Sequence, residues 1–446
     1  MSEPKPNVNE CSLNPREQRR NMVLYALCAA MVYLSAPIVY VGIVQVSLCN
    51  ALGLSDAAAN LPSAAFYFAM TAPLFVAWRF HTVAAVKPVL CVSFLLAALA
   101  CLLVALVLVL QTSAAVRLIA LVLHGGAIGG TTAVTSAFQW EVISRGMEVR
   151  RRGFALSMAY GVGPLFAVVG SMGAQLVLAG AIELPWYSPQ YGLGMIPLAM
   201  PRVEFPRNFA FLFAAAAPLL ALAALLTTRY VLPPQVGAEP PRLPLIAGLR
   251  RGSREFLRDM VLRRAMIAYL LVGAGGSVVT IMALYTPEAM GRASVDFAGY
   301  QSAIRFAFKM TAGLFLGWLV VRTHAKMGAI VTATLYLAGV FWVLLVPHAW
   351  FMICFGLMGA GDLSGVYFPN YIMTASSPDK VRYNVAYLQL MNLPICAAPT
   401  FLGVISDAFG RQASFLAAAG LLMAAVTVIT LGLPPDPRPV LRHAET

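Results

Sequence analysis

The stretch FKMTAGLF at 308–315 and the stretch FAMTAPLF at 68–75, which lies 240 positions earlier, decide the architecture of this chain. Two further pairs keep the same order and nearly the same separation: RRNMVLYAL (19–27) with RRAMIAYLL (263–271), and RFH (79–81) with RTH (322–324). An apolar bias could produce one such match. Three matches in one order indicate an internal duplication, so the chain consists of two copies of one unit.

Each copy is built from long apolar segments. The 446 residues are 60% hydrophobic and only 11% charged, whereas soluble domains are about 45–50% apolar and about 25% charged. A helix of about 20 apolar residues crosses the hydrocarbon core of a membrane. Twelve segments meet this length: 22–48, 58–78, 88–110, 116–140, 154–181, 208–228, 265–287, 298–320, 328–347, 350–374, 385–405 and 412–433. Because six crossings return the chain to the same side, we predict an all-α integral membrane protein with twelve transmembrane helices in two parallel six-helix repeats.

The basic residues are distributed unevenly between these segments. With the N-terminus in the cytoplasm, the inside segments hold 24 of the 31 lysine and arginine residues, and the outside loops hold five. This split follows the positive-inside rule, so both termini are predicted to be cytoplasmic. We expect a multi-pass protein of the plasma (inner) membrane. The formal charge of +13 then faces the anionic lipid bilayer and indicates no nucleic-acid partner.

The predicted domains follow from the spans. They are a cytoplasmic N-tail (1–21), an N-terminal six-helix bundle (22–228), a cytoplasmic linker (229–264), a C-terminal six-helix bundle (265–433) and a cytoplasmic C-tail (434–446). Two proline pairs early in the linker favour a loop. Apolar residues at helical spacing over 253–261 favour either a short amphipathic helix on the inner leaflet or a plain solvated linker.

Other classes of function lack their signatures in this sequence. The seven cysteines form no C-x-x-C pair and no metal-ligand spacing, so no metal site is expected. There is no G-x-x-x-x-G-K-[ST] loop for ATP, and neither H-E-x-x-H nor G-x-S-x-G occurs. We therefore predict no catalytic residues, no cofactor and no enzyme activity.

Parallel six-helix halves resemble the transporters of the major facilitator superfamily. That superfamily carries the pattern G-x-x-x-D-R-x-G-R-R between helices two and three and again between helices eight and nine. Residues 317–326 are similar to this pattern, with matches at Gly317, Arg322 and Lys326. The first-half copy keeps only Arg79. The resemblance implies secondary transport by alternating access, with spans one, four, seven and ten lining a central cavity.

These loop residues, together with a second motif, are assigned to conformational gating. Gly163 and Pro164 in span five, with Gly161 before them, look like the Gly-Pro motif of drug/proton antiporters. The same residues are also typical of a hinged or closely packed helix, because small residues allow two backbones to approach.

Four ionisable residues lie inside predicted spans, where charge is costly and is therefore a sign of function. Arg305 and Lys309 share one face of span eight, while the corresponding positions in the first half are alanines. Counted at 1.5 Å per residue from the outer face, Arg305 lies roughly 10 Å deep and Lys309 roughly 16 Å deep. Asp362 on span ten is roughly 18 Å deep and His124 on span four roughly 12 Å deep. All four are expected to face one cavity.

Two interpretations of these charges remain open. In the first, Arg305 or Lys309 pairs with Asp362 and only locks two helices together. In the second, the cation left over attracts an anion, since an arginine fork binds carboxylate or phosphate oxygens. The superfamily's carboxylate transporters also place a basic residue on the eighth helix, which this chain resembles. Further polar and aromatic candidates for the pocket are Tyr33, Tyr40, Tyr269, Tyr285, Tyr367, Asn370 and Gln389.

The sequence thus predicts a transporter for a small-molecule substrate, acting most simply as a proton-coupled symporter of a small organic anion. Arg305, Lys309, His124, Tyr269, Tyr367 and Asn370 are the predicted substrate-binding residues, and Asp362 and His124 the predicted proton carriers. The alternatives are proton-coupled efflux of a drug or metabolite, transport of a neutral sugar or nucleoside, and a non-transporting sensor. We expect a monomer.

Overall fold

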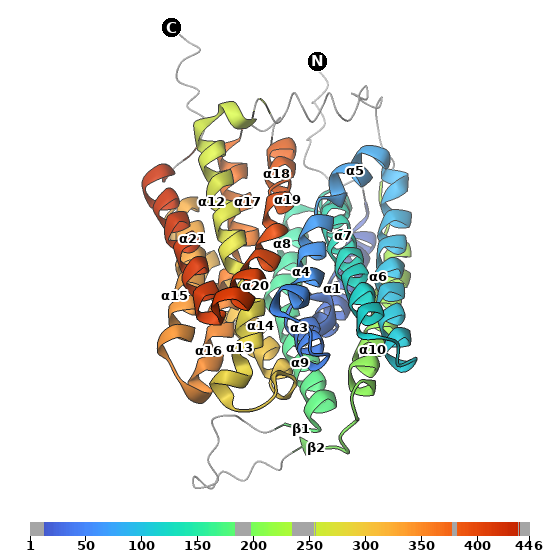
Figure 1. Cartoon of the computed structure of the whole chain (residues 1–446). Helices are drawn as coiled ribbons and strands as arrows, with labels where there is room; N and C mark the ends of the chain where they lie inside the picture. Colours follow the sequence, from blue (N-terminus) through green and yellow to red (C-terminus); the bar gives the residue numbers. More distant parts are fainter. Residues whose placement is uncertain are drawn as a thin grey trace, which may run out of the picture.

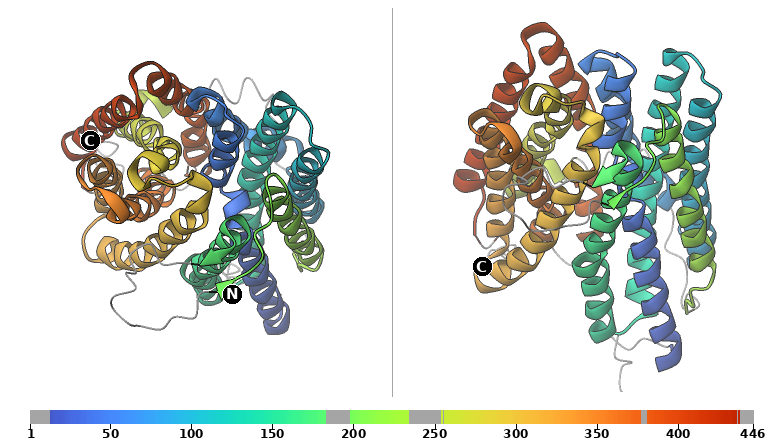
Figure 2. Two further views of the ribbon diagram at one scale, coloured as in Figure 1. Left: turned by 60° about the horizontal axis from the view of Figure 1, so that its bottom comes forward. Right: turned by 90° about the horizontal axis from the view of Figure 1, so that it is seen from below.

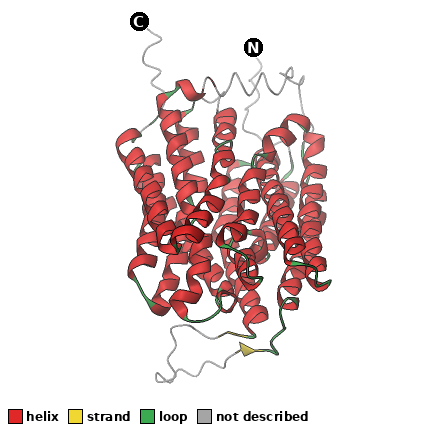
Figure 3. Ribbon diagram, viewed as in Figure 1, coloured by secondary structure: helices red, strands yellow, loops and turns green. Residues whose placement is uncertain are grey.

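The computed structural model describes residues 13–182, 198–233, 254, 256–376, 381–435 and 437. These residues are almost entirely helical (Figure 3). One short antiparallel pair of strands, β1 (Ala181–Ile182) and β2 (Leu198–Ala199), aligns Ala181 with Ala199. The predicted all-α fold is therefore confirmed over the described part of the chain.

The helices follow the twelve predicted spans in order. Their bounds in the first half are α1 (Pro15–Leu34), α2 (Ala36–Val39), α3 (Ile43–Ala51), α4 (Asp56–Ala69), α5 (Ala72–Arg79), η1 (Val83–Ala85), α6 (Val86–Val109), α7 (Ala114–Gly146), α8 (Val149–Ser157), η2 (Met158–Val162), α9 (Gly163–Ala179) and α10 (Arg207–Thr228). In the second half they are α12 (Met260–Gly276), α13 (Val279–Met290), η4 (Ser294–Asp296), α14 (Ala298–Arg322), α15 (Ala325–Leu345), η5 (His348–Met352), α16 (Ile353–Gly361), α17 (Ser364–Ala375), α18 (Val381–Gln389), α19 (Asn392–Ile395), α20 (Ala397–Phe409) and α21 (Arg411–Gly432).

Eleven of these spans are long and apolar enough to cross a membrane in the described residues. The remaining one is the first, in which α1, α2 and α3 are separate pieces. The chain leaves helical geometry at Ser35, two residues before Pro37, whose ring has no N–H to donate. It turns again at Gly42, where φ is +154°. Only glycine adopts such a backbone at little cost, so the break is fixed by the sequence.

Prolines also interrupt other spans. Pro73 cannot donate to the carbonyl four residues earlier, and the second span divides there into α4 and α5. Pro164 follows a π-helical turn, η2, in the fifth span. The tenth span divides into α16 and α17 at Asp362 and Leu363, ahead of Pro369.

The helices pack into two groups, which we call the first bundle (α1–α10) and the second bundle (α12–α21). Figure 2 shows the groups side by side, in blue to green and in yellow to red. The bundles meet where α14 packs along α9, α20 along α4, and α13 along α3. In Figure 1, α5 and the start of α12 lie at the top and the β1–β2 pair at the bottom. We name these ends the termini face and the hairpin face, because α1 begins and α21 ends at the upper one.

At the hairpin face each bundle caps a helix of the other. The Asp407 carboxylate at the end of α20 accepts the backbone N–H groups of Asp56 and Ala57, which begin α4, at 2.8 and 3.0 Å. The Gln175 amide oxygen near the end of α9 accepts the N–H groups of Gly299 and Tyr300, which begin α14, at 3.0 and 3.3 Å. The first N–H groups of a helix have no partner within the helix, so each bundle satisfies donors that the other leaves open.

Some sequence predictions concern residues outside the described part of the chain. These are most of the N-tail (1–12), most of the linker (234–253 and 255) and nearly all of the C-tail (436 and 438–446). Of the predicted amphipathic stretch 253–261, residues 254 and 256–261 are described, and all of them except Asp259 are helical.

Candidate functional site

A hydrogen-bonded triad lies in the second bundle, between α14, α15 and α16. The Arg305 guanidinium donates from Nε and Nη2 to the two carboxylate oxygens of Asp362, at 2.8 and 3.0 Å. The Tyr336 hydroxyl donates to Oδ1 of the same carboxylate at 2.7 Å. The arginine and aspartate side chains are 13% and 14% exposed. Such bidentate, charge-assisted hydrogen bonds are among the strongest that side chains form in proteins.

Glycines allow close packing between the helices of this triad, and between α15 and the neighbouring α12. A Cβ atom at Gly359 would meet the backbone carbonyl oxygen of Arg305. A Cβ atom at Gly361 would come within 2.6 Å of the Tyr336 ring, and one at Gly276 within 2.9 Å of its opposite end. Any larger residue would push these helices apart. Asp362 itself lies at the break between α16 and α17, where the carboxylate is close to backbone that is not regularly helical.

Lys309 is one helical turn from Arg305 on α14, but no ion pair joins it to a carboxylate among the described residues. Its ammonium lies 5.1 Å from the centre of the Tyr40 ring, which belongs to the first bundle. The Tyr40 ring contacts Phe306 of α14 edge to face, with centroids 4.8 Å apart. Tyr33 stacks on Tyr40 at 6.2 Å. The cation therefore faces an aromatic wall across the boundary of the two bundles, a favourable cation–π arrangement.

The hairpin face is closed by bonds between the bundles. Arg411 of α21 donates from Nε and Nη2 to the Asp56 carboxylate at 2.9 and 3.0 Å, and from Nη1 to Glu288 at 2.6 Å. The Ser406 hydroxyl also donates to Asp56. Further bonds across the boundary join Ser47 to Ser294, Thr280 to Asn60 and Arg202 to Asp296. Together with the reciprocal helix caps, they fasten both bundles at this end of the central site.

His124 does not join the other charged residues. We expected it to share their cavity, but its side chain is fully buried inside the first bundle. Its Nε2 lies 3.7 Å from the Cys101 thiol of α6, and its ring meets Phe213 of α10 edge to face at 5.1 Å. The depth estimate placed the residue along the membrane normal but not around the axis of α7. The side chain points toward α6 and α10, away from the second bundle.

The polar residues predicted on spans seven and ten occupy separate places. Tyr269 is nearly buried and packs on Phe368, with ring centroids 5.5 Å apart. Tyr367 is also nearly buried, in a small cluster with Leu316 and Leu363. Asn370 is partly exposed on α17 and lies two turns from Asp362. The structure thus brings only Arg305, Lys309 and Asp362 together from the predicted site.

The predicted gating residues lie toward the termini face. Arg79 is exposed over the Phe80 ring at 5.4 Å, and Arg322 over the Trp318 ring at 4.7 Å. Lys326 is buried and donates to the Thr430 carbonyl of α21 at 2.7 Å. Nothing lies within 4 Å of a Cβ atom built at Gly317. Each of these contacts joins residues of the same bundle, Arg79 in the first and Arg322 and Lys326 in the second.

Gly163 and Pro164 are buried just after the π-helical turn η2. A Cβ atom at Gly163 would come within 2.5 Å of the Tyr33 ring. The glycine therefore allows the fifth span to pack closely against the first, and it supports a ring of the aromatic wall.

Sequence reasoning missed Tyr336 and Phe306, and it missed the residues that close the hairpin face. Tyr336 is on the ninth span, which the family resemblance does not place on the cavity. A hydroxyl in an otherwise apolar span is a usable signal, because a buried tyrosine needs a hydrogen-bond partner. No signal within the sequence pairs Asp56 with Arg411. Among the described residues, no three His, Cys, Asp or Glu side chains gather as a metal site.

No protein-family model matches the chain, and no curated protein matches it in sequence. Solved structures do match. A mutant of the nucleoside transporter NupG has a TM-score of 0.63 at 15% identity, over 93% of this chain and 99% of that one. A POT family transporter in complex with 5-aminolevulinic acid has a TM-score of 0.62 at 12% identity, over 95% and 97%. The major facilitator superfamily transporter FucP, in the outward conformation, has a TM-score of 0.58 at 16% identity, over 93% and 99%.

The chain therefore has the fold of the major facilitator superfamily transporters, as the sequence resemblance predicted. The long apolar helices and this fold make it a multi-pass membrane protein.

Proposed function

We propose that this chain is a secondary active transporter that moves a small organic anion together with protons by alternating access. The shared fold supports transport, because transporters with this fold carry small solutes through a site between their two bundles. In the orientation with cytoplasmic termini, closure of the hairpin face corresponds to a site that is shut toward the outside. The substrate class and the coupling follow from the charges at the boundary between the bundles.

The observation that carries the substrate class is the unequal number of charges on α14 and α16. Arg305 and Asp362 neutralise each other in a closed, bidentate pair. Lys309 adds one more positive charge, and its ammonium lies 5.1 Å from the centre of the Tyr40 ring. An anionic group that reached the boundary would gain a full ion pair with this ammonium. A carboxylate attached to an apolar or aromatic body would also fit the adjoining wall of Tyr33, Tyr40 and Phe306.

Proton coupling is assigned to Asp362. While Arg305 and Tyr336 donate hydrogen bonds to the Asp362 carboxylate, its negative charge is balanced without a proton. A substrate anion near Lys309 competes for the Arg305 guanidinium only one helical turn away. If Arg305 turns toward the substrate, Asp362 loses its counter-ion and gains affinity for a proton. His124 is left out of the proposed route because Cys101 and Phe213 enclose it.

The test compares ligand classes on purified protein and on three variants. We expect organic carboxylates to raise the thermal unfolding temperature of the wild type, since a ligand at about 100 times its dissociation constant adds about 2.7 kcal/mol of stability. Lys309→Gln should fold and lose this response, while Lys87→Gln, which removes a lysine charge at the start of α6, should keep it. Lys309→Arg should retain part of it, because the positive charge remains.

Flux measurements then separate a transporter from a sensor. Proteoliposomes should accumulate the stabilising anion when an inward proton gradient is imposed, and Asp362→Asn should uncouple uptake from that gradient. Stabilisation without flux would indicate a receptor. Stabilisation by nucleosides or sugars in the wild type and in Lys309→Gln alike would favour a neutral substrate, for which the aromatic wall is also suited. Stabilisation by lipophilic cations alone would favour efflux.

A further inference from the structure

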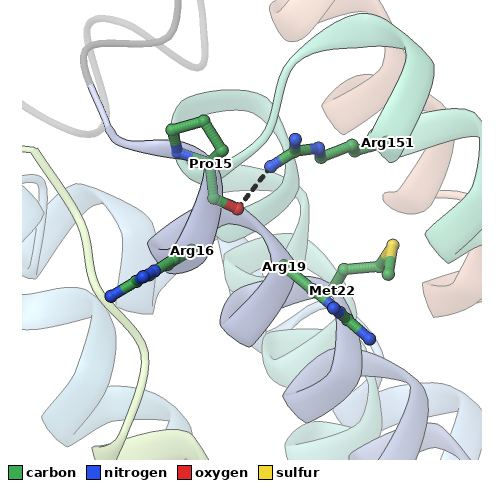
Figure 4. Close-up of a pocket in the computed structure, with 5 residues that line it drawn as sticks. All are labelled: Pro15, Arg16, Arg19, Met22 and Arg151. Atoms are coloured by element: carbon green, nitrogen blue, oxygen red, sulfur yellow. Dashed lines mark hydrogen bonds between the residues drawn. The ribbon is translucent and has the colours of Figure 1, made fainter.

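A second charged site lies at the termini face of the first bundle, away from the triad. A pocket of about 350 Å³ is lined by Pro15, Arg16, Arg19 and Met22 of α1 and by Arg151 of α8. Figure 4 shows Arg151 reaching over to the Pro15 carbonyl, Arg19 running beside Met22, and Arg16 extending from the other side of α1. Three arginines from two helices therefore line one pocket.

The carboxylates next to this pocket are already engaged. Glu17 accepts the backbone N–H of Asn14 at 3.0 Å and completes the cap of α1. Glu148 pairs with Arg151 at 3.0 Å. Arg16 and Arg19 are exposed and have no ion pair among the described residues. Within the described part of the chain the pocket thus has a surplus of positive charge, which comes from Arg16 and Arg19.

The surface below the arginines is apolar on both helices. Along α1, Arg19 is followed at helical spacing by Val23 and Leu27, which are 45% and 43% exposed. Beyond Arg151, the chain presents Phe154 and Met158 at helical spacing, 56% and 36% exposed. At 1.5 Å per residue, these side chains lie roughly 5–12 Å deeper than the arginines. Lipid chains cover such surfaces in a membrane.

We infer that this pocket binds the phosphate group of an anionic phospholipid, with the acyl chains running along α1 and α8. Arginine forks bond phosphate oxygens in pairs. Basic pockets between helices at a membrane surface recognise lipid headgroups in this way. The Arg151 bond to Pro15 already ties α8 to the start of α1. A lipid phosphate between Arg19 and Arg151 would strengthen the same connection. The inference does not depend on the substrate proposed above.

The experiment measures thermal unfolding in detergent with added phosphatidylglycerol or phosphatidylcholine of identical acyl chains. A further arm uses inorganic phosphate, to separate a lipid site from a site for soluble phosphate. We expect phosphatidylglycerol alone to stabilise the wild type. In the double variant Arg16→Gln/Arg19→Gln, its apparent affinity should fall about fivefold for each arginine removed. Arg19→Lys should recover part of the loss, because it keeps the charge but not the fork.

Arg322→Gln is the control, since it removes one exposed arginine from the same face of the second bundle. It should leave the response to phosphatidylglycerol unchanged. If the loss per arginine removed is the same in Arg322→Gln as in the double variant, only the general surface charge matters, and the proposal is overturned. Stabilisation by inorganic phosphate equal to that by phosphatidylglycerol would also overturn it, in favour of a soluble ligand.

Discussion

The second and eighth spans are copies of one another, yet only one of them carries charge into the membrane. The sequence alignment pairs Arg305 with Ala65 and Lys309 with Ala69. Pro73 in the first copy corresponds to Gly313 in the second. Accordingly, the second span breaks into α4 and α5, whereas α14 runs without interruption from Ala298 to Arg322.

The two copies share their packing despite this difference. A Cβ atom at Gly129 of α7 would meet the Phe66 carbonyl of α4, just as one at Gly359 of α16 would meet the Arg305 carbonyl of α14. Each copy also receives its helix cap from the other bundle. The duplication therefore kept the helix crossings and caps that build the scaffold, while the ionic chemistry was placed in one half. Matched substitutions in the two halves can test this division.

The largest effect is expected from breaking the buried pair. Arg305→Ala leaves the Asp362 carboxylate without its counter-ion and should lower the free energy of unfolding by about 3–5 kcal/mol. The double variant Arg305→Ala/Asp362→Ala makes this position resemble the first half and should recover most of that loss. Thermal or chemical unfolding in detergent measures both. If the double variant is no more stable than the single one, the charges are not the reason for the loss.

The two reciprocal caps should differ in strength. Gln175 is 1% exposed, so Gln175→Ala leaves two buried N–H groups unpaired. It should destabilise the conformation with the closed hairpin face by about 3 kcal/mol. Asp407 is exposed and water can replace it, so Asp407→Ala should cost about 1 kcal/mol or less. Spin labels at Val116 and Leu345, in a background without native cysteines, report the distance across this face. A wider opening in Asp407→Ala than in Gln175→Ala would contradict the expectation.

The two glycine crossings should respond alike in stability and differently in function. Gly129→Ala and Gly359→Ala each force helices apart at a backbone carbonyl and should cost about 1–2 kcal/mol. Only Gly359→Ala displaces the backbone of Arg305, so only this variant should also lose stabilisation by organic carboxylates. Unfolding with and without such a ligand measures both quantities. An equal loss of the ligand response in both variants would show that the second half holds no separate site.

The smallest effect is expected at the exposed arginines near the termini face. Arg79→Gln and Arg322→Gln each remove a guanidinium from one aromatic ring, and both should stay within about 0.5 kcal/mol of the wild type. If either arginine forms a gate between the bundles in another conformation, its substitution should change the transport rate. The free energy of unfolding of the conformation described here should then stay the same. The comparison of flux with unfolding in the same two variants decides this.

The spans could be predicted from the sequence because, in a chain of this composition, an apolar segment of about 20 residues indicates a membrane-spanning helix. The pairing of charges could be predicted only in part. Counting from residue 350 placed Asp362 level with Lys309. The structure instead pairs Asp362 with Arg305, which lies one helical turn from Lys309 on the same face of α14. A count of residues along a span gives depth only to within about a turn, so it could not decide which of the two cations holds the carboxylate.

Direction around a helix was harder to predict than depth. His124 and Arg305 have similar depths along their spans, but His124 points into its own bundle. The caps by Gln175 and Asp407 join residues more than a hundred positions apart. No local pattern marks such a partner, because a glutamine or aspartate near a helix end is common in any protein.

The excess charge on Lys309 has an electrical consequence for the proposed cycle. In the proposed cycle a monovalent anion and one proton bind together, so their charges cancel and the loaded site carries the same single positive charge as the empty site. A full charge that crosses 100 mV gains or loses about 2.3 kcal/mol, and a site near the midplane senses roughly half of this. An inside-negative potential then favours the inward-facing state of the loaded and of the empty carrier equally. It would speed delivery of the substrate to the cytoplasm and slow the return of the empty site by the same factor, and a cycle that moves one anion with one proton would carry no net charge.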